Sequence, residues 1–283
     1  EKNLQVAFRA VVKVSSPGVL KLKVTGSTLY RATVNGRHAG YGPARGPHGY
    51  YRIDVWDLSG PARQGENIVG IEVAGYNVNS YYTLDQPSFL QAEVLEGDKV
   101  LAATGVSGFE AAVPAERVQK VQRYSFQRPF SEVYRLRADH DRWQTDPAAA
   151  FNPVKCAVDD RPLKYLPRRV PYPEFKTRGE PSLISAGTVS PATPANIWKD
   201  RSLTAIGAQL KGYLETELEV IPSIEMQRLT SRAGPGGPPT KLRPGEAFQL
   251  AASQYRILDF GLNATGFIGA RVTAGEPTRL VLA

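Results

Sequence analysis

The sequence has 283 residues, enough for two domains of ordinary size with hydrophobic cores. Hydrophobic residues make up 42% and charged residues 22% of the chain, the composition of a globular protein, and no apolar run is long enough to span a membrane. The single cysteine, Cys156, excludes an internal disulfide and a cysteine-rich zinc site. A lone cysteine is more often a buried, unreactive thiol than a nucleophile, so we expect Cys156 to be buried.

The net charge of +8 raises the question of nucleic-acid binding. Residues 1–145 and 146–283 each carry a net charge of +4, so the charge is not concentrated in one part. Residues 117–142 and 161–178 are locally basic, but neither stretch is a dense cluster interleaved with stacking aromatic residues. We therefore expect no nucleic-acid partner and interpret these stretches as solvated or interdomain surface.

Strand patterns dominate the first half of the chain. Apolar and polar residues alternate over 4–14, 20–24 and 90–94, a period of two that is typical of strands with one buried face. A Glu-Gly-Asp turn leads from the third run into a strand at 99–103, and we expect residues 133–137 to form a closing strand. Short strands separated by Gly, Pro and Asn turns indicate an antiparallel sandwich.

A hairpin opens the most informative block of the sequence. Asn35 and Gly36 stand between two strand-like runs, and both tolerate the positive φ angles that a type I′ turn needs. A Gly/Pro-rich loop follows at 40–49. The strand at 68–74 then runs directly into the tyrosine-rich stretch 75–82. A rigid sheet that presents aromatic and amide side chains on a loop is well suited to hold sugars.

Nine of the 22 prolines fall within residues 147–194. Proline removes backbone donors, so we interpret 147–195 as an extended connector, packed by aromatic residues such as Phe151 and Tyr172.

A second β region follows the connector. Leucine, threonine and valine alternate with glutamate over 214–220, which predicts a strand with an acidic outer face. Further strands are expected near 248–251, 256–259, 266–273 and 279–282.

The predicted fold class is therefore all-β, with two antiparallel β-sandwich domains of the jelly-roll or galactose-binding-like type. The expected boundaries are 1–146 for the N-terminal sandwich, 147–195 for the Pro-rich connector and 196–283 for the second sandwich.

The candidate contact site is the loop after the strand at 68–74. Aromatic rings suit the C–H faces of sugars and amides suit their hydroxyls, so the loop faces either a carbohydrate or another domain. Its candidate residues are Tyr76, Asn77, Asn79, Tyr81 and Tyr82.

No catalytic motif accompanies this loop. Glycoside hydrolysis needs two carboxyl groups on opposite sides of a bond, and Asp54, Asp57, Glu72 and Asp85 lie in or near the block. Asp57 is better explained as the cap of the turn that follows it, and Glu72 as a strand residue. The three histidines are scattered, so we expect no metal site, and no nucleotide, dinucleotide or serine-hydrolase motif points to a cofactor.

An ordered series of weak motifs resembles the N-terminal β region of bacterial α-L-rhamnosidases and related glycoside hydrolases. The first block carries Val34-Asn35-Gly36, Gly40, Tyr50-Tyr51, Asp54-Val55, Leu58 and Gly65-Glu66-Asn67; Phe130-Ser131-Glu132-Val133-Tyr134 looks like its closing segment; Leu258-Asp259-Phe260-Gly261 with Thr265-Gly266 is similar to the second sandwich. The first block alone is shared with sugar-binding sandwiches of other glycosidases.

In that family the acid and base sit in an (α/α)₆ barrel, and no position of this chain matches the catalytic motif. The resemblance implies the non-catalytic region of a hydrolase that acts on rhamnose-containing glycans. This region supports a catalytic domain beyond Ala283, can line the substrate cleft and is inactive alone. It implies a bacterial periplasmic or extracellular location with the signal peptide removed. Two alternatives stay open, namely a stand-alone carbohydrate-binding module and a scaffold without a ligand.

Overall fold

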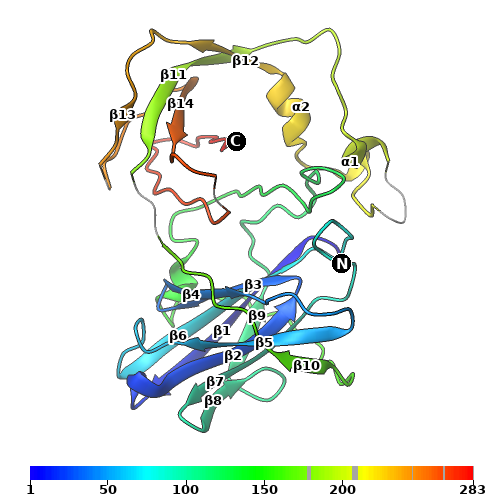
Figure 1. Ribbon diagram of the computed structural model, residues 1–283, viewed down its shortest axis with the longest axis vertical. Coiled ribbons are helices and arrows are strands. Elements are labelled where there is room, and N and C mark those ends of the chain that lie inside the picture. The colour runs from blue at the N-terminus through cyan, green and yellow to red at the C-terminus, as the bar shows by residue number, and fades with distance from the viewer. Residues whose placement is uncertain (177–179, 206–209, 244, 264, 283) are drawn as a thin grey trace. The chain divides into compact units, whose positions relative to one another are not determined.

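The computed structural model describes all residues except 177–179, 206–209, 244, 264 and 283. The chain divides into two compact units (Figure 1). Unit 1 comprises Glu1–Phe175 and Pro194–Arg228, and unit 2 comprises Lys176–Thr193 and Leu229–Ala283.

Unit 1 is built on two five-stranded sheets (Figure 1). The first has the strand order β4-β3-β6-β1-β9, and all its pairs are antiparallel. Its strands are β1 (Leu4–Val14), β3 (Leu29–Val34), β4 (Arg37–Gly42), β6 (Gly65–Gly75) and β9 (Phe109–Ala112).

The second sheet has the order β10-β5-β2-β7-β8. Its strands are β2 (Leu20–Ser27), β5 (Tyr50–Asp57), β7 (Phe89–Glu96), β8 (Lys99–Ala103) and β10 (Lys164–Pro167). β10 pairs in parallel with β5 at the edge, while the other pairs are antiparallel.

The core lies between the inner faces of these sheets. The alternation seen in the sequence places Ala10, Val12 and Val14 of β1 in one buried cluster with Leu20 and Leu22 of β2. The intervening residues of both strands point outward, as the period of a strand requires. The all-β sandwich expected from the sequence is confirmed.

The hairpin between β3 and β4 is also as expected. Asn35 and Gly36 have φ angles of 50° and 74°, and Val34 pairs with Arg37 across the turn. Asn35 also accepts a hydrogen bond from the backbone N–H of Ile68 at 3.0 Å, which ties the turn to β6.

A second, smaller cluster holds the later segment of unit 1 against the earlier one. It contains Tyr76, Val78, Val118, Val121, Phe130 and Tyr213. Val121 forms an isolated parallel bridge with Val220, so residues 194–228 belong to unit 1 although they follow the Pro-rich stretch.

The predicted strand at 214–220 is wrong. This segment contains the short 3₁₀ helix η3 (Glu215–Glu217), because the side chain of Glu217 accepts a hydrogen bond from the backbone N–H of Leu214 at 2.7 Å and closes a turn. The expected strand at 133–137 is reduced to a single bridge between Arg117 and Tyr134. The other short helices are η1 (Pro17–Val19), η2 (Arg142–Gln144), α1 (Arg201–Thr204) and α2 (Pro222–Gln227).

Unit 2 contains one four-stranded antiparallel sheet in its described residues. Its strands are β11 (Ser182–Pro191), β12 (Leu229–Ala233), β13 (Thr240–Lys241) and β14 (Gln254–Asp259). β14 matches the strand expected at 256–259. The runs at 248–251, 266–273 and 279–282 form no strand, and Phe248, Ile268 and Leu282 are exposed because no second sheet covers them among the described residues. One sheet thus stands where a second sandwich is expected.

The boundaries expected at 147 and 195 do not coincide with this division into units. Residues 164–167 extend a sheet of unit 1, and the proline-free run 182–190 forms most of β11 in unit 2. The prolines of the expected extended connector fall largely outside these two stretches, which therefore can pair as strands. Part of the expected connector, 177–179, and part of the expected second sandwich lie outside the described residues.

Candidate functional site

The loop after β6 lies partly inside the protein. Tyr76 is 9% exposed and belongs to the second buried cluster together with the fully buried Val78. Burial raises the pKa of the Tyr76 phenol to about 12, because the charged form is disfavoured away from water. Tyr76 therefore anchors the loop and does not present its ring to a ligand.

The two asparagines of the loop use their amides within the protein. Asn77 donates from Nδ2 to the backbone oxygen of Glu1 at 2.8 Å and accepts from the Ser88 hydroxyl at 2.7 Å. Asn79 accepts from the backbone N–H of Asp85 at 3.0 Å. These contacts fix the shape of the loop and leave its amides with less capacity for sugar hydroxyls.

Tyr81 and Tyr82 are the outward-facing members of the predicted set. Tyr81 is 76% exposed, and its hydroxyl accepts a hydrogen bond from Gln127 Nε2 at 2.8 Å. The guanidinium groups of Arg45 and Arg128 lie 5.8 and 5.7 Å from the centroid of the Tyr82 ring. The structure thus brings the five predicted residues into one loop, of which these two rings remain for an external contact.

The Arg123 side chain fixes the backbone of this loop. Its side chain is buried, and it donates to the backbone oxygens of Asn79 at 2.7 Å and Arg128 at 2.9 Å, and also to those of Phe126 and Leu210. One guanidinium therefore satisfies carbonyls from three chain segments, a use that its planar array of five donors permits.

The four carboxylates considered for catalysis are all engaged in structural contacts. Asp54 is fully buried in an ion pair with Arg168 at 2.9 Å. Asp57 caps its turn, as the sequence predicted, by accepting from the Ser59 N–H at 2.9 Å. This hydrogen bond lowers the pKa of the Asp57 carboxyl. Glu72, on β6 as expected, pairs with Arg31, and Asp85 with Lys211. None of the four is a free acid–base group.

No group of three His, Cys, Asp or Glu side chains that could hold a metal ion occurs among the described residues. Cys156 is exposed, so the expectation of a buried thiol is wrong; it lies in an extended segment outside both sheets of unit 1.

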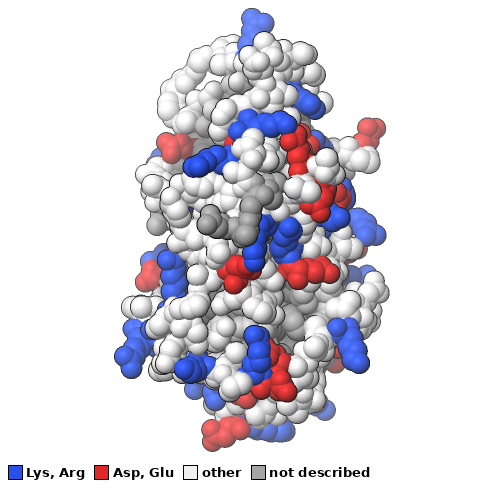
Figure 2. Space-filling view, turned by 90° about the vertical axis from the view of Figure 1, so that its right-hand side faces the viewer, with Lys and Arg blue, Asp and Glu red and all other residues white. Residues whose placement is uncertain are grey.

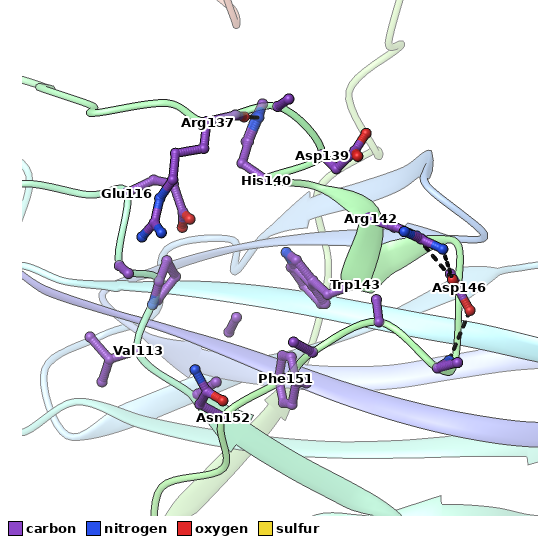
Figure 3. A pocket seen from close by; sticks show the side chains of 18 residues that line it. Val113, Glu116, Arg137, Asp139, His140, Arg142, Trp143, Asp146, Phe151 and Asn152 are labelled. Atoms are coloured by element: carbon purple, nitrogen blue, oxygen red, sulfur yellow. Dashed lines mark hydrogen bonds and ion pairs between the residues drawn. The ribbon is translucent and has the colours of Figure 1, made fainter.

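A pocket of about 490 Å³ lies on the outer face of the first sheet of unit 1. Ala7 of β1 and Ala112 of β9 form part of its floor, and the segment 137–152 forms much of its wall. Figure 3 shows Trp143 and Phe151 in the middle of this lining, with Arg137 and Glu116 together on one side. We call this feature the Trp143 pocket.

The aromatic part of the Trp143 pocket is held firmly. The ring centroids of Trp143 and Phe151 are 5.5 Å apart, and the Arg9 guanidinium lies 4.4 Å from the Phe151 centroid. Arg9 also donates to the backbone oxygen of Ala149 and to Glu110, both at 3.1 Å. These contacts fix the segment before Asn152 on β1 and β9.

Four polar side chains that line the pocket are available to a ligand. For the side chains of Glu116, Arg137, Asp139 and Asn152, the described residues supply no hydrogen-bond or ion-pair partner within the structure. The remaining charged pair, Arg142 with Asp146 at 2.8 Å, closes the opposite side (Figure 3). The pocket therefore offers free donors and free acceptors beside two aromatic rings.

The pocket was not predicted from the sequence, because residues 138–146 have the pattern of a polar stretch and Phe151 was interpreted as an anchor of the connector. The available signal was Trp143 itself, since a large aromatic residue is unusual in such a stretch.

Charged side chains of both signs are interspersed over the face shown in Figure 2. No helix among the described residues has the length and apolarity needed to cross a membrane.

The fold is similar to that of the GH78 family rhamnosidase of Bacillus sp. GL1. The TM-score is 0.52 at 22% identity, over 66% of this chain and 22% of that chain. An α-L-rhamnosidase of Streptomyces avermitilis, solved in complex with L-rhamnose, aligns with a TM-score of 0.44 at 15% identity over 85% of this chain and 26% of that one. The native α-L-rhamnosidase of Aspergillus terreus aligns with a TM-score of 0.41 at 15% identity, over 86% and 31%.

No protein-family model and no curated protein matches the sequence. The chain spans between about a fifth and a third of the length of these rhamnosidases. The likeness to the Bacillus enzyme confirms the β fold that the sequence motifs indicated, and it is confined to a minor part of that enzyme's length.

Proposed function

We propose that this chain is the accessory, non-catalytic β region of an α-L-rhamnosidase-type glycoside hydrolase that acts on rhamnose-containing glycans. The observation that carries the proposal is the fold likeness to a GH78 rhamnosidase, confined to 22% of that enzyme's length. The whole ordered series of motifs, from Val34 to Gly266, supports it independently, because it resembles the same family.

The four carboxylates considered for catalysis support a non-catalytic role. A glycosidase needs one carboxyl group that donates a proton and a second that acts as base or nucleophile. The carboxylates of Asp54, Glu72 and Asp85 are tied to Arg or Lys partners, and Asp57 caps a turn. The acid and base of the hydrolase belong, in this proposal, to an (α/α)₆ catalytic domain of the same protein beyond Ala283.

The Tyr76–Tyr82 loop serves this proposal as a contact surface. Tyr81 and Tyr82 are exposed at a loop that Arg123 and Tyr76 hold in place, so they contact the catalytic domain or line its substrate cleft. Neither a metal nor a cofactor enters the proposal. The protein acts in the bacterial periplasm or outside the cell, where glycans are accessible.

An activity assay tests the proposal. The 283-residue chain alone should leave p-nitrophenyl α-L-rhamnopyranoside intact, whereas the product of the complete gene should hydrolyse it in preference to the β-D-glucopyranoside. Hydrolysis by the chain alone would refute the non-catalytic role. A complete gene product without rhamnosidase activity would refute the assignment to this class of enzyme.

A stand-alone carbohydrate-binding module is the second candidate, favoured by the exposure of Tyr81 and Tyr82. It requires glycan binding that is lost in the Tyr81→Ala/Tyr82→Ala double variant, and a gene that encodes no catalytic domain. A scaffold without a ligand, the third reading, requires that the wild-type chain bind no glycan at all.

A further inference from the structure

We propose that the Trp143 pocket binds one neutral pyranose residue of a glycan, packed on Trp143 and hydrogen-bonded by Asn152, Glu116 and Arg137. This site is separate from the Tyr76–Tyr82 loop and goes beyond the accessory role above. It would give the β region a glycan contact of its own.

The size and position of the Trp143 pocket suit a sugar ring. The pocket has a volume of about 490 Å³, within the range of roughly 300–1,000 Å³ that small-molecule sites occupy. It lies on the outer face of the first sheet, where Ala7 and Ala112 leave room because their side chains are small. A sugar ring could therefore reach the floor without displacing the sandwich core.

The aromatic platform is preorganised. Trp143 is half-buried, and its six-membered ring packs against the backbone of β6 at Gly70, where an added Cβ would lie 3.0 Å from Cζ3. Phe151 contacts both the Trp143 ring and the Arg9 guanidinium. Rings that are fixed before binding lose little conformational entropy when a ligand packs on them.

The uncommitted polar groups match sugar hydroxyls. A hydroxyl both donates and accepts, so it needs donors and acceptors in its surroundings. Asn152 offers both, Glu116 accepts and Arg137 donates, and the described residues make no competing contact with these side chains. Figure 3 shows Arg137 and Glu116 on one side of the aromatic pair and Asn152 beside Phe151.

The charge balance favours a neutral ligand. Arg137 is the cation without an ion-pair partner among the described lining residues, while Glu116 and Asp139 are carboxylates without one. An anionic ligand would meet two carboxylates for one available guanidinium, which disfavours a phosphate or a uronate. A neutral pyranose with one apolar face fits both halves of the pocket.

Tryptophan fluorescence provides the experiment, since the chain has three tryptophans and only Trp143 lines the pocket. The intact chain is titrated with methyl α-L-rhamnopyranoside, methyl β-D-galactopyranoside, methyl α-D-glucopyranoside and sodium glucuronate, and weak binding is measured in parallel by saturation-transfer NMR. We expect a neutral glycoside to bind and to change the emission. Trp143→Ala should weaken binding about tenfold or more, the loss typical of a central aromatic contact.

Two further variants protect the test against misfolding. Asn152 is exposed, and its side chain makes no hydrogen bond within the described structure, so Asn152→Ala should keep the wild-type unfolding midpoint and still weaken binding severalfold. Trp198→Ala removes a tryptophan that is 66% exposed outside the pocket and should leave the affinity unchanged.

The proposal is overturned if no neutral glycoside binds the folded chain, or if binding survives both Trp143→Ala and Asn152→Ala. Tighter binding of glucuronate that depends on Arg137 would overturn the neutral-ligand assignment. Failure of these titrations is distinguishable from failure of the proposed rhamnosidase role, because that role is judged by hydrolysis with the complete gene product.

Discussion

Asp54 and Arg168 form a buried ion pair 114 positions apart in the chain, with 2.9 Å between Oδ1 and Nη1. The Asp54 side chain is fully buried, and that of Arg168 is 10% exposed. Arg168 also donates to the backbone oxygens of Val170 and Pro171 at 3.0 Å. The pair therefore fixes the segment after β10 on the second sheet of unit 1.

Removal of Asp54 should be strongly destabilising. Asp54→Ala leaves the Arg168 guanidinium buried without its counter-charge and removes an acceptor of the Tyr30 hydroxyl. Breaking one partner of a buried pair typically costs about 3–5 kcal/mol. We expect a loss of about 3 kcal/mol in the free energy of unfolding, measured by urea denaturation.

The exposed pair of Asp159 and Arg161 supplies the control for this prediction. Its side chains are 29% and 53% exposed, so Asp159→Ala should leave the urea midpoint unchanged. Equal midpoints for Asp54→Ala and Asp159→Ala would show that the buried pair adds nothing to the stability of unit 1.

Stability should decrease at alkaline pH because of buried phenols. Burial raises the pKa of Tyr76 and of Tyr213 to about 12 from the ordinary 10.0. The unfolded chain releases these protons near pH 10, while the folded chain holds them to about pH 12. Between these values the folded state binds more protons, so stability falls as pH rises, by up to about 1.4 kcal/mol per unit for each tyrosine.

Urea unfolding at pH 9, 10.5 and 11.5 measures this dependence. The decrease in stability with rising pH should be absent below pH 9. Its slope above pH 9 should be shallower in Tyr76→Phe, which has no ionisable phenol. Tyr81→Phe is the matched control, because Tyr81 is 76% exposed. A slope that is the same in wild type and Tyr76→Phe would contradict the assignment to Tyr76.

The first sandwich was accessible from the sequence because its signals are local. The period of two in β1 and β2, and the Asn35-Gly36 turn, each depend on neighbours within a few residues. The run at 214–220 has the same alternation and yet forms η3, since the Glu217 carboxylate binds the Leu214 N–H. Alternation cannot reveal whether a partner strand is present.

The candidate site was harder to predict from the sequence for a related reason. Tyr76 to Tyr82 were correctly placed in one loop, but which rings are buried depends on Val118 and Tyr213, distant in sequence. The Trp143 pocket depends on the packing of η2 onto β6, a contact that no local pattern encodes.

Arg123 should be essential for the ordered state of the Tyr76–Tyr82 loop. Arg123→Met removes the guanidinium that donates hydrogen bonds to four backbone carbonyls, including that of Asn79. Methionine keeps an apolar stem at this position. Hydrogen bonds from a charged donor contribute about 1.5–3 kcal/mol each, and several are lost together. We expect a loss of at least about 3 kcal/mol in unfolding free energy.

Hydrogen exchange locates the effect of this change. Amides of Ser80 and Thr83, protected by contacts within the loop, should exchange faster in Arg123→Met than in wild type. Arg128→Met is the matched control because Arg128 is exposed, and its unfolding free energy should stay within about 0.5 kcal/mol of wild type. Unchanged protection in Arg123→Met would show that the loop is held by other contacts.

Gly70 should be required for the geometry of the Trp143 pocket. A Cβ at this position of β6 would lie 2.8 Å from Thr33 Oγ1 and 3.0 and 3.1 Å from two carbons of the Trp143 ring. Gly70→Val should therefore push the indole outward, at a cost of about 1–3 kcal/mol in unfolding free energy. The fluorescence emission of Trp143 should shift to longer wavelength as the exposure of its indole to water increases. The affinity for the glycoside should fall in the same variant. Gly60→Val is the control, since no atom lies within 4 Å of a Cβ there. Wild-type emission and affinity in a folded Gly70→Val protein would contradict the packing of Trp143 on β6 as the basis of the site.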